Sequence, residues 1–200
     1  MDYPSFLTRL TRGLAAAPPP SVTLEPPPRR AAVAAIFRPG DPADLLFIRR
    51  AEVPGDPWSG HVAFPGGRQE PRDGDPGSAA LREVREEVGL DLTLGARSLG
   101  ALPVQLTLPL NGRRMVVHPF VHALHADAPL ASDPVEVQRT LWVPFTALVA
   151  GEGQGEMTWS WQGQDLRLPC RRLQGEVLWG MTLRMVEDLL RAWERGGRLT

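Results

Sequence analysis

The stretch that decides the fold of this 200-residue chain reads Gly66-Gly67-Arg68-Gln69-Glu70 and continues, after a short loop, as Leu81-Arg82-Glu83-Val84-Arg85-Glu86-Glu87-Val88-Gly89-Leu90. Asp75 is a good N-cap and Pro76 suits the first turn of a helix. Gly89 suits the left-handed position just past a helix end. The sequence therefore predicts a helix from Pro76 to Val88 that follows a glycine-rich loop.

One face of this helix should carry carboxylates. At about 100° per residue, Glu83, Glu86 and Glu87 fall within one arc of roughly 100°. The opposite side is apolar, with Leu81, Val84 and Val88. Glu83 and Glu87 form an i,i+4 pair of like charges, which costs a few tenths of a kcal/mol on a bare helix. Arg82 can offset part of this cost, and a divalent cation would offset more. Three hard oxygen donors suit Mg²⁺ or Mn²⁺ rather than zinc.

The segment resembles the Nudix box, G-x5-E-x7-R-E-U-x-E-E-x-G-U, in which U is an aliphatic residue. Residues 82–90 match its second half at every position, and Gly67 would be its first glycine. The loop between them is one residue longer than the pattern. Counting forward from Gly67 puts Asp73 at the box's first glutamate, whereas counting back from Arg82 puts Gly74 there. We expect Asp73 to take that place.

This resemblance implies an α/β fold of the α/β/α sandwich type, with a mixed sheet and a loop–helix–loop metal site. It implies that Glu83, Glu86 and Glu87 bind metal, joined by the backbone carbonyl of Gly66, and that Arg82 orients the glutamates. The metal would neutralise phosphate charge while water attacks a phosphorus of a diphosphate. The base would be Glu83 or an acidic residue from a later loop. The available residues are Asp133, Glu136, Glu152 and Glu156, and we favour Glu136.

Segments outside the box are similar to the coenzyme A diphosphatase branch of the family. The Gly60–Gly67 run matches its Gly-x-Val-Ala-Phe-Pro-Gly-Gly portion, and the Arg50-Ala51 pair also matches. A later arginine of the branch is missing, because Gly55 stands near its place, and the spacer before Gly60 is one residue longer. The resemblance implies cleavage of coenzyme A to 3',5'-ADP and 4'-phosphopantetheine. The alternatives are ADP-ribose, a dinucleotide or a nucleoside triphosphate as substrate, or a nucleotide-binding Nudix-like module without turnover.

Arginine must supply every cationic contact to a nucleotide, because the chain contains no lysine. The absence of lysine also excludes a Walker-type phosphate loop and Schiff-base chemistry. We expect Arg49 and Arg50, at the end of a predicted strand, and the ring of Phe64 to contact the substrate. Trp58 is a second candidate ring, whereas His61 and Trp179 are more simply explained as structural residues.

The remainder of the chain indicates one domain with a short N-terminal extension. Residues 1–30 should hold a helix, over 4–17, and a proline-rich linker, and residues 31–200 the Nudix domain. A closing amphipathic helix is expected over 178–193. The predicted strands cover 31–37, 45–48, 62–64, 99–106, 115–124, 141–143, 157–161 and 166–168, with turns at Pro109, Asn111-Gly112 and Gln162-Gly163.

The composition of the chain argues against nucleic-acid and membrane partners. A formal net charge of -1 provides no electrostatic basis for non-specific nucleic-acid binding. No apolar run approaches the roughly 20 residues that span a bilayer. We therefore expect a small nucleotide diphosphate as the substrate, with no nucleic-acid or membrane partner. Cys170 is the only cysteine, and the N-terminus does not resemble a secretory signal, so we expect a cytoplasmic protein. A homodimer is compatible with the sequence.

Overall fold

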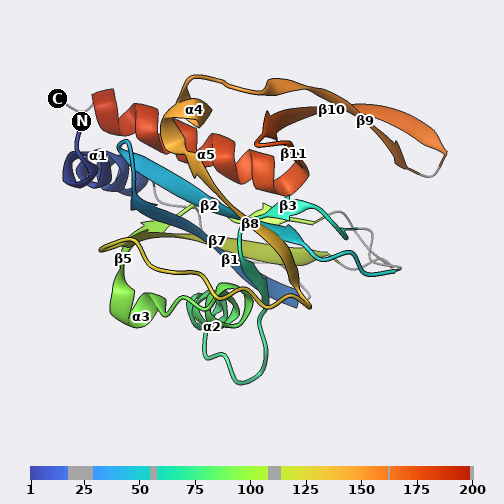
Figure 1. The fold of residues 1–200 in the computed structure, drawn as a ribbon, viewed down its shortest axis with the longest axis horizontal. Helices are drawn as coiled ribbons and strands as arrows, with labels where there is room; N and C mark the ends of the chain where they lie inside the picture. The colour runs from blue at the N-terminus through green and yellow to red at the C-terminus, as the bar shows by residue number, and fades with distance from the viewer. Residues whose placement is uncertain (18–28, 55–57, 108–113, 162, 199–200) are drawn as a thin grey trace.

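The computed structural model describes residues 1–17, 29–54, 58–107, 114–161 and 163–198. A mixed sheet lies between two layers of helices, which confirms the predicted α/β/α sandwich (Figure 1). Its path runs β3-β2-β1-β7-β5, with β8 added on β2, β4 on β1 and β6 on β7. Only the β1–β7 pair is parallel among the pairs described for this sheet. Its strands are β1 (Arg29–Pro39), β2 (Ala43–Arg50), β3 (Val62–Ala63), β4 (Gly66–Arg68), β5 (Ala96–Ala101), β6 (Gln105–Leu106), β7 (Met115–Leu124) and β8 (Val137–Pro144).

Helices cover both faces of this sheet. The helices α1 (Tyr3–Ala15) and α5 (Gly180–Arg198) lie together on one face, and α2 (Pro76–Val88) and the short α3 (Leu92–Gly95) lie on the other (Figure 1). The five-residue α4 (Phe145–Val149) follows β8 directly. A second antiparallel sheet, in the order β11-β10-β9, projects from the body of the molecule beside α5. Its strands are β9 (Gln154–Trp161), β10 (Gln164–Leu173) and β11 (Glu176–Trp179).

The two faces of the large sheet bury separate cores. On one face the ring of Phe6, from α1, makes edge contacts with Phe37 and Phe145 at centroid distances of 5.2 and 5.4 Å. On the other, Val84 and Val88 of α2 pack against Ile36 and neighbouring strand residues. Because β1 is covered on both faces, its sequence is almost continuously apolar. Helix α1 shares the core of the domain, and β1 begins at Arg29, so the boundary expected after residue 30 falls inside this strand.

The structure corrects two predicted elements. The strand expected over 99–106 is divided into β5 and β6, and Pro103, which has no backbone N–H to donate, lies between them. The closing helix begins at Gly180 rather than Leu178, because Leu178 and Trp179 pair with β10 as part of β11. Gly180 then takes the left-handed conformation, with φ at +64°, where the strand turns into the helix.

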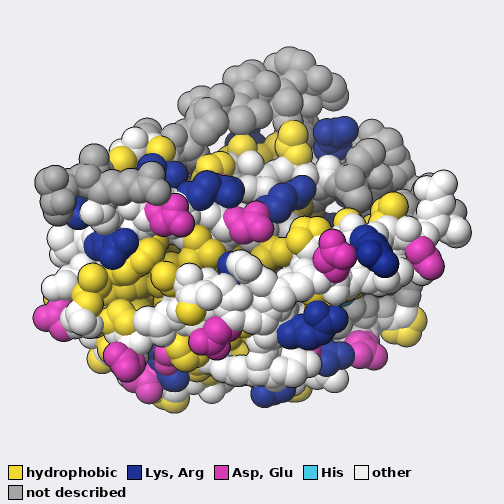
Figure 2. All heavy atoms as spheres, turned by 90° about the horizontal axis from the view of Figure 1, so that it is seen from above, with side chains coloured by type: hydrophobic (Ala, Val, Ile, Leu, Met, Phe, Trp, Pro, Cys, Tyr) yellow, Lys and Arg dark blue, Asp and Glu magenta, His cyan; other side chains and the backbone are white. Residues whose placement is uncertain are grey.

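Several expectations fall on residues outside those described: the proline-rich linker at 18–28, Gly55, the turn through Pro109 and Asn111-Gly112, and Gln162. Among the described residues, no helix is both long and apolar enough to cross a membrane. On the face shown in Figure 2, arginine and acidic side chains are interspersed, and the described residues there form no large patch of one charge.

Candidate active site

The site is built where the glycine-rich strand β4 packs on helix α2. Gly66 and Gly67 pair with Val33 and Ala32 of β1. A Cβ on Gly66 would lie 2.3 Å from the carbonyl oxygen of Ala32, and φ is +146° there. A Cβ on Gly67 would lie 2.5 Å from the carboxyl carbon of Glu83. Both positions therefore need glycine so that the strand can approach the sheet and the helix closely.

Helix α2 has the ends that the sequence predicts. The side chain of Asp75 accepts a hydrogen bond from the backbone N–H of Ser78 at 2.8 Å, and Pro76 occupies the first turn. Gly89 ends the helix with φ at +74°. Val84 and Val88 are fully buried, and Glu83, on another side of the helix, lies against Gly67 of the glycine-rich strand.

Three carboxylates meet at this junction. One oxygen each of Glu83, Glu87 and Glu136 lies within 4.8 Å of the others. The backbone N–H of Gly66 donates to Glu87 Oε2 at 2.7 Å, and the Glu87 side chain is almost completely buried. Glu136 comes from the loop before β8, which is fixed in place because its carbonyl accepts from the backbone N–H of Ala51 at 2.8 Å.

The electrostatics of this acidic cluster favour a bound cation. Burial raises the pKa of Glu87 to about 8, and the negative charges of Glu83 and Glu136 add to the increase. Burial also raises the pKa of Glu83. Carboxylate oxygens gathered in this way are the donors that hard divalent cations prefer. The residues present thus fit a divalent metal ion, with Glu83, Glu87 and Glu136 as its holders.

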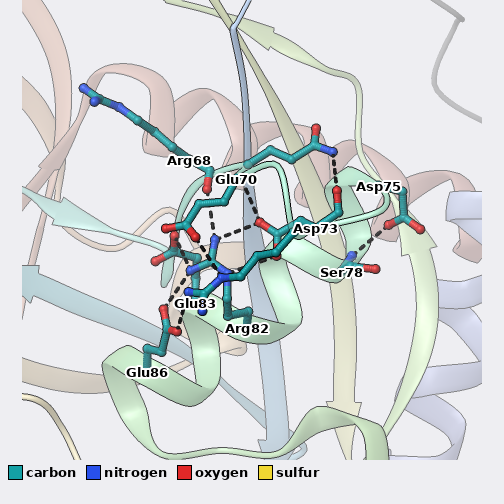
Figure 3. A network of polar contacts seen from close by, with 10 residues as sticks. Arg68, Glu70, Asp73, Asp75, Ser78, Arg82, Glu83 and Glu86 are labelled. Atoms are coloured by element: carbon teal, nitrogen blue, oxygen red, sulfur yellow. Dashed lines mark hydrogen bonds and ion pairs between the residues drawn. The ribbon is translucent and has the colours of Figure 1, made fainter.

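Arg82 forms ion pairs with three carboxylates in and around the acidic cluster (Figure 3). It makes ion pairs with Asp73 at 2.9 Å, with Glu83 at 3.0 Å and with Glu86 at 2.7 Å. Asp73 is buried, and its hydrogen bonds from Arg82 hold its pKa at about 2. Asp73 is thus the carboxylate of this loop that holds Arg82, whereas Gly74 has no side chain to offer. The equivalence of Asp73 to the first glutamate of the box stays a prediction.

The structure does not bring Glu86 into the cluster. Its exposed carboxylate contacts Arg82 and, at 3.3 Å, Arg72. The assignment of Glu86 as a metal ligand therefore stays a prediction, and so does that of the Gly66 carbonyl. Of the other acidic candidates for the base, Asp133 accepts from the N–H of Val135, and Glu156 lies on β9 beside Arg167; neither belongs to the described cluster.

The predicted substrate residues divide into two groups. Arg50, at the end of β2, lies near the cluster, since its charge lowers the pKa of Glu87. Arg49 makes ion pairs with Glu52 and Glu176, both at 3.1 Å. Phe64, in contrast, is only 1% exposed and stacks on Phe47 at 5.1 Å. Its ring is part of the core and has no face available to a nucleobase, which corrects the expectation for this residue.

The NUDIX domain model matches residues 27–159, which include the whole of this site. The chain belongs to the Nudix family. It is 31% identical over 149 residues to the Nudix hydrolase NudL of Photorhabdus laumondii, a match that covers 74% of this chain and 76% of that protein. It is 30% identical to the chloroplastic Nudix hydrolase 22 of Arabidopsis thaliana, with 78% of this chain and 52% of that protein covered.

Solved structures show the same Nudix fold. The Nudix domain of Shewanella oneidensis NrtR, complexed with ADP ribose, aligns with a TM-score of 0.55 at 15% identity and covers 91% of this chain and 96% of that one. The MutT Nudix hydrolase of Burkholderia pseudomallei aligns with a TM-score of 0.52 at 22% identity, covering 81% and 98%. Membership of the family, together with the relatives named Nudix hydrolases, identifies the chain as a Nudix diphosphatase.

One charged group near this Nudix site has no signal in the sequence. Arg139, on β8, pairs in register with Arg49 on β2. The carboxylate of Glu176, on β11, contacts Arg49 at 3.1 Å and Arg139 at 3.5 Å. The strand predicted over 141–143 does not reach Arg139, which the structure includes in β8. Its contact with Glu176 joins distant parts of the chain, so no local sequence pattern predicts it.

Proposed function

We propose that this Nudix hydrolase cleaves the diphosphate of coenzyme A to 3',5'-ADP and 4'-phosphopantetheine, with Mg²⁺ or Mn²⁺ as the metal. The observation that carries the proposal is that the Arg50-Ala51 pair, which matches the signature of the coenzyme A diphosphatase branch, lies next to the acidic cluster. The Ala51 N–H bonds to the Glu136 carbonyl, and the Arg50 charge acts on Glu87. Signature and acidic cluster thus belong to one site.

In this proposal each residue of the acidic cluster, and each arginine beside it, has its own role. Glu83, Glu87 and Glu136 hold the metal, which when bound neutralises charge on the phosphate oxygens and lowers the pKa of water. Arg82 keeps the Glu83 carboxylate in place through their 3.0 Å ion pair. Glu136 is the most exposed of the three and accepts the proton of the attacking water, with Glu83 as the second candidate for this role. Arg50 contacts the diphosphate.

A second substrate is favoured by one departure from the branch signature. Gly55 stands where the branch has an arginine, and the spacer before Gly60 is one residue longer. A chain without this arginine has one cation fewer for a substrate that carries several phosphates. ADP-ribose, which carries fewer phosphates than coenzyme A, is therefore the alternative. A cytoplasmic location and a homodimer stay predictions from the sequence.

A substrate panel tests the proposal. The purified full chain is incubated with Mg²⁺ or Mn²⁺ and with coenzyme A, ADP-ribose, NADH, diadenosine polyphosphates or nucleoside triphosphates, and the products are separated. We expect the highest kcat/KM with coenzyme A and two products, 3',5'-ADP and 4'-phosphopantetheine. A clear preference for ADP-ribose would contradict coenzyme A as the substrate but would still support metal-dependent cleavage of a diphosphate. No turnover with any of these compounds would favour a nucleotide-binding module.

A further inference from the structure

Four aromatic side chains form a row next to the end of β2 that carries Arg50. The ring of His61 makes edge contacts with Trp58 at 5.9 Å and with Trp179 at 4.8 Å. Trp179, in turn, lies 5.1 Å from Trp159 of β9. Trp58 is 37% exposed, and the other three are half-buried. The row therefore presents aromatic surface to solvent that the core does not use.

Backbone contacts connect this row to the acidic cluster. The carbonyl of His61 accepts a hydrogen bond from the Arg50 N–H at 3.0 Å, and Arg50 is the arginine whose charge acts on Glu87. The next residue, Ala51, bonds to Glu136. Only one backbone hydrogen bond thus separates the strand end at the acidic cluster from the aromatic row.

An arginine pair lies along the same edge. Glu176 precedes Trp179 by three residues on β11 and contacts both Arg49 and Arg139. The Arg49 guanidinium also reaches the backbone before His61, since a Cβ on Gly60 would lie 3.7 Å from its Nη2. The Arg49 and Arg139 side chains are 31% and 53% exposed. Aromatic surface and accessible cations are therefore adjacent.

We propose that Trp58, His61 and Trp179 form the stacking surface for the purine base of the substrate, with Arg49 and Arg139 beside it for the phosphates of the nucleotide half. The inference rests on the proposed function, because it assigns the nucleotide end of the same substrate. A flat base matches aromatic faces and is bound by stacking. The pantetheine arm has neither a flat face nor a charge for the arginines, so the row suits it less. This row takes the role that the sequence suggested for Phe64.

The stacking surface can be tested without turnover, by measuring the binding of compounds that represent parts of the substrate. Calorimetry on the full chain measures Kd for adenosine 5'-phosphate, for ribose 5-phosphate, which lacks the base, and for 4'-phosphopantetheine. The variants are Trp58→Ala, Trp58→Phe, which keeps an aromatic ring, and Trp142→Phe as a control. Trp142 lies on β8 with its ring against Arg38, outside the aromatic row.

Base stacking is typically lost in an alanine variant at a cost that corresponds to roughly tenfold or more in Kd. We expect Trp58→Ala to raise the Kd for adenosine 5'-phosphate by about that factor, and Trp58→Phe to restore most of the lost affinity. Ribose 5-phosphate and 4'-phosphopantetheine should bind the variants as they bind the wild type, and Trp142→Phe should change nothing. Unchanged binding of adenosine 5'-phosphate in Trp58→Ala would overturn the inference, as would a loss confined to 4'-phosphopantetheine.

These results separate the inference from the proposed function. Base-dependent binding that is lost in Trp58→Ala supports the stacking surface even when coenzyme A is not hydrolysed, and failure of hydrolysis then counts against the proposed substrate alone. Hydrolysis of coenzyme A with an unchanged KM in Trp58→Ala supports the substrate and contradicts the stacking surface.

Discussion

Arg82 donates two hydrogen bonds to the carboxylate of Asp73, from Nε to Oδ1 at 3.0 Å and from Nη2 to Oδ2 at 2.9 Å. The backbone N–H of Glu70 also donates to Oδ2, at 2.8 Å. Through this two-point contact, the loop before α2 holds the guanidinium that in turn pairs with Glu83. Asp73 thus anchors the Arg82 guanidinium to this loop, although the loop is one residue longer than the Nudix box pattern.

Replacing Asp73→Asn should destabilise the protein and weaken catalysis. Removing one member of a buried ion pair costs roughly 3–5 kcal/mol, and we expect about 3 kcal/mol because Arg82 keeps Glu83 and Glu86 as partners. Urea unfolding followed by circular dichroism measures this change. Asp73→Glu retains the charge and should stay within about 1 kcal/mol of the wild type. Equal stability of Asp73→Asn and the wild type would show that this pair has no supporting role.

Replacing Gly67→Ala should impair turnover while the fold survives. The new Cβ would lie 2.5 Å from the Glu83 carboxyl carbon, so the carboxylate must move away from the cluster. Misplacement of a catalytic group by an ångström can cost about a hundredfold in rate, and we expect kcat to fall by about that factor. Gly74→Ala, in the loop between β4 and α2, is the matched control because its Cβ would meet no atom within 4 Å. Similar kcat values for the two variants would contradict the close packing of Gly67 on Glu83.

Replacing Glu136→Gln should weaken metal binding. Its carboxylate completes the cluster with Glu83 and Glu87, so its loss removes a charged donor. Since even residues that only support metal ligands change affinity by about 10–100-fold, we expect Kd for Mn²⁺ to rise at least about tenfold. Calorimetric titration measures it. Glu152→Gln changes a glutamate in the turn after α4 and should leave the Kd unaltered; if the two variants behave alike, Glu136 is not a ligand.

The sequence predicted the parts of the site that depend on local pattern. Asp75, Pro76 and Gly89 set the ends of α2 through capping, which acts over a few residues. Arg82 and the glutamates follow from helical spacing. Of the four loop acids that are candidates for the base, Glu136 is the one that the structure places in the acidic cluster, where the Ala51 hydrogen bond attaches its loop to the end of β2. Its role as the base stays a prediction.

The rest depends on contacts between distant segments. Phe64 lies beside the box in sequence, which suggests contact with the substrate, but a local pattern does not show whether an aromatic ring is exposed. Its packing on Phe47 places the ring in the core. Leu178 and Trp179 have the apolar spacing of the closing helix, but pairing with β10 takes them into β11. The helical position of Glu86 would also suit a metal ligand, but its exposed carboxylate contacts Arg82 and Arg72, and the latter contact joins residues fourteen positions apart.

Metal binding should strengthen as the pH rises towards 8. Without metal, burial holds the pKa of Glu87 at about 8, far above its usual 4.5, so this carboxyl is mostly protonated at neutral pH. A cation binds the ionised form and must displace the proton, so the apparent Kd should fall by up to about tenfold per pH unit below 8 and level off above it. Calorimetry at several pH values, in buffers of different ionisation enthalpy, should reveal one released proton at pH 7. A Kd that does not change between pH 6 and 8 would contradict the buried, protonated state of Glu87.

The most direct measurement is the rate of coenzyme A hydrolysis against Mg²⁺ concentration, for the wild type and for Glu87→Gln. We predict no hydrolysis in excess chelator, a saturable rise in the wild type as Mg²⁺ is added, and no comparable rise in a Glu87→Gln variant whose circular dichroism spectrum is unchanged. Hydrolysis by the wild type in excess chelator, or the same metal-dependent rate in both proteins, would contradict the assignment of this acidic cluster as the catalytic metal site.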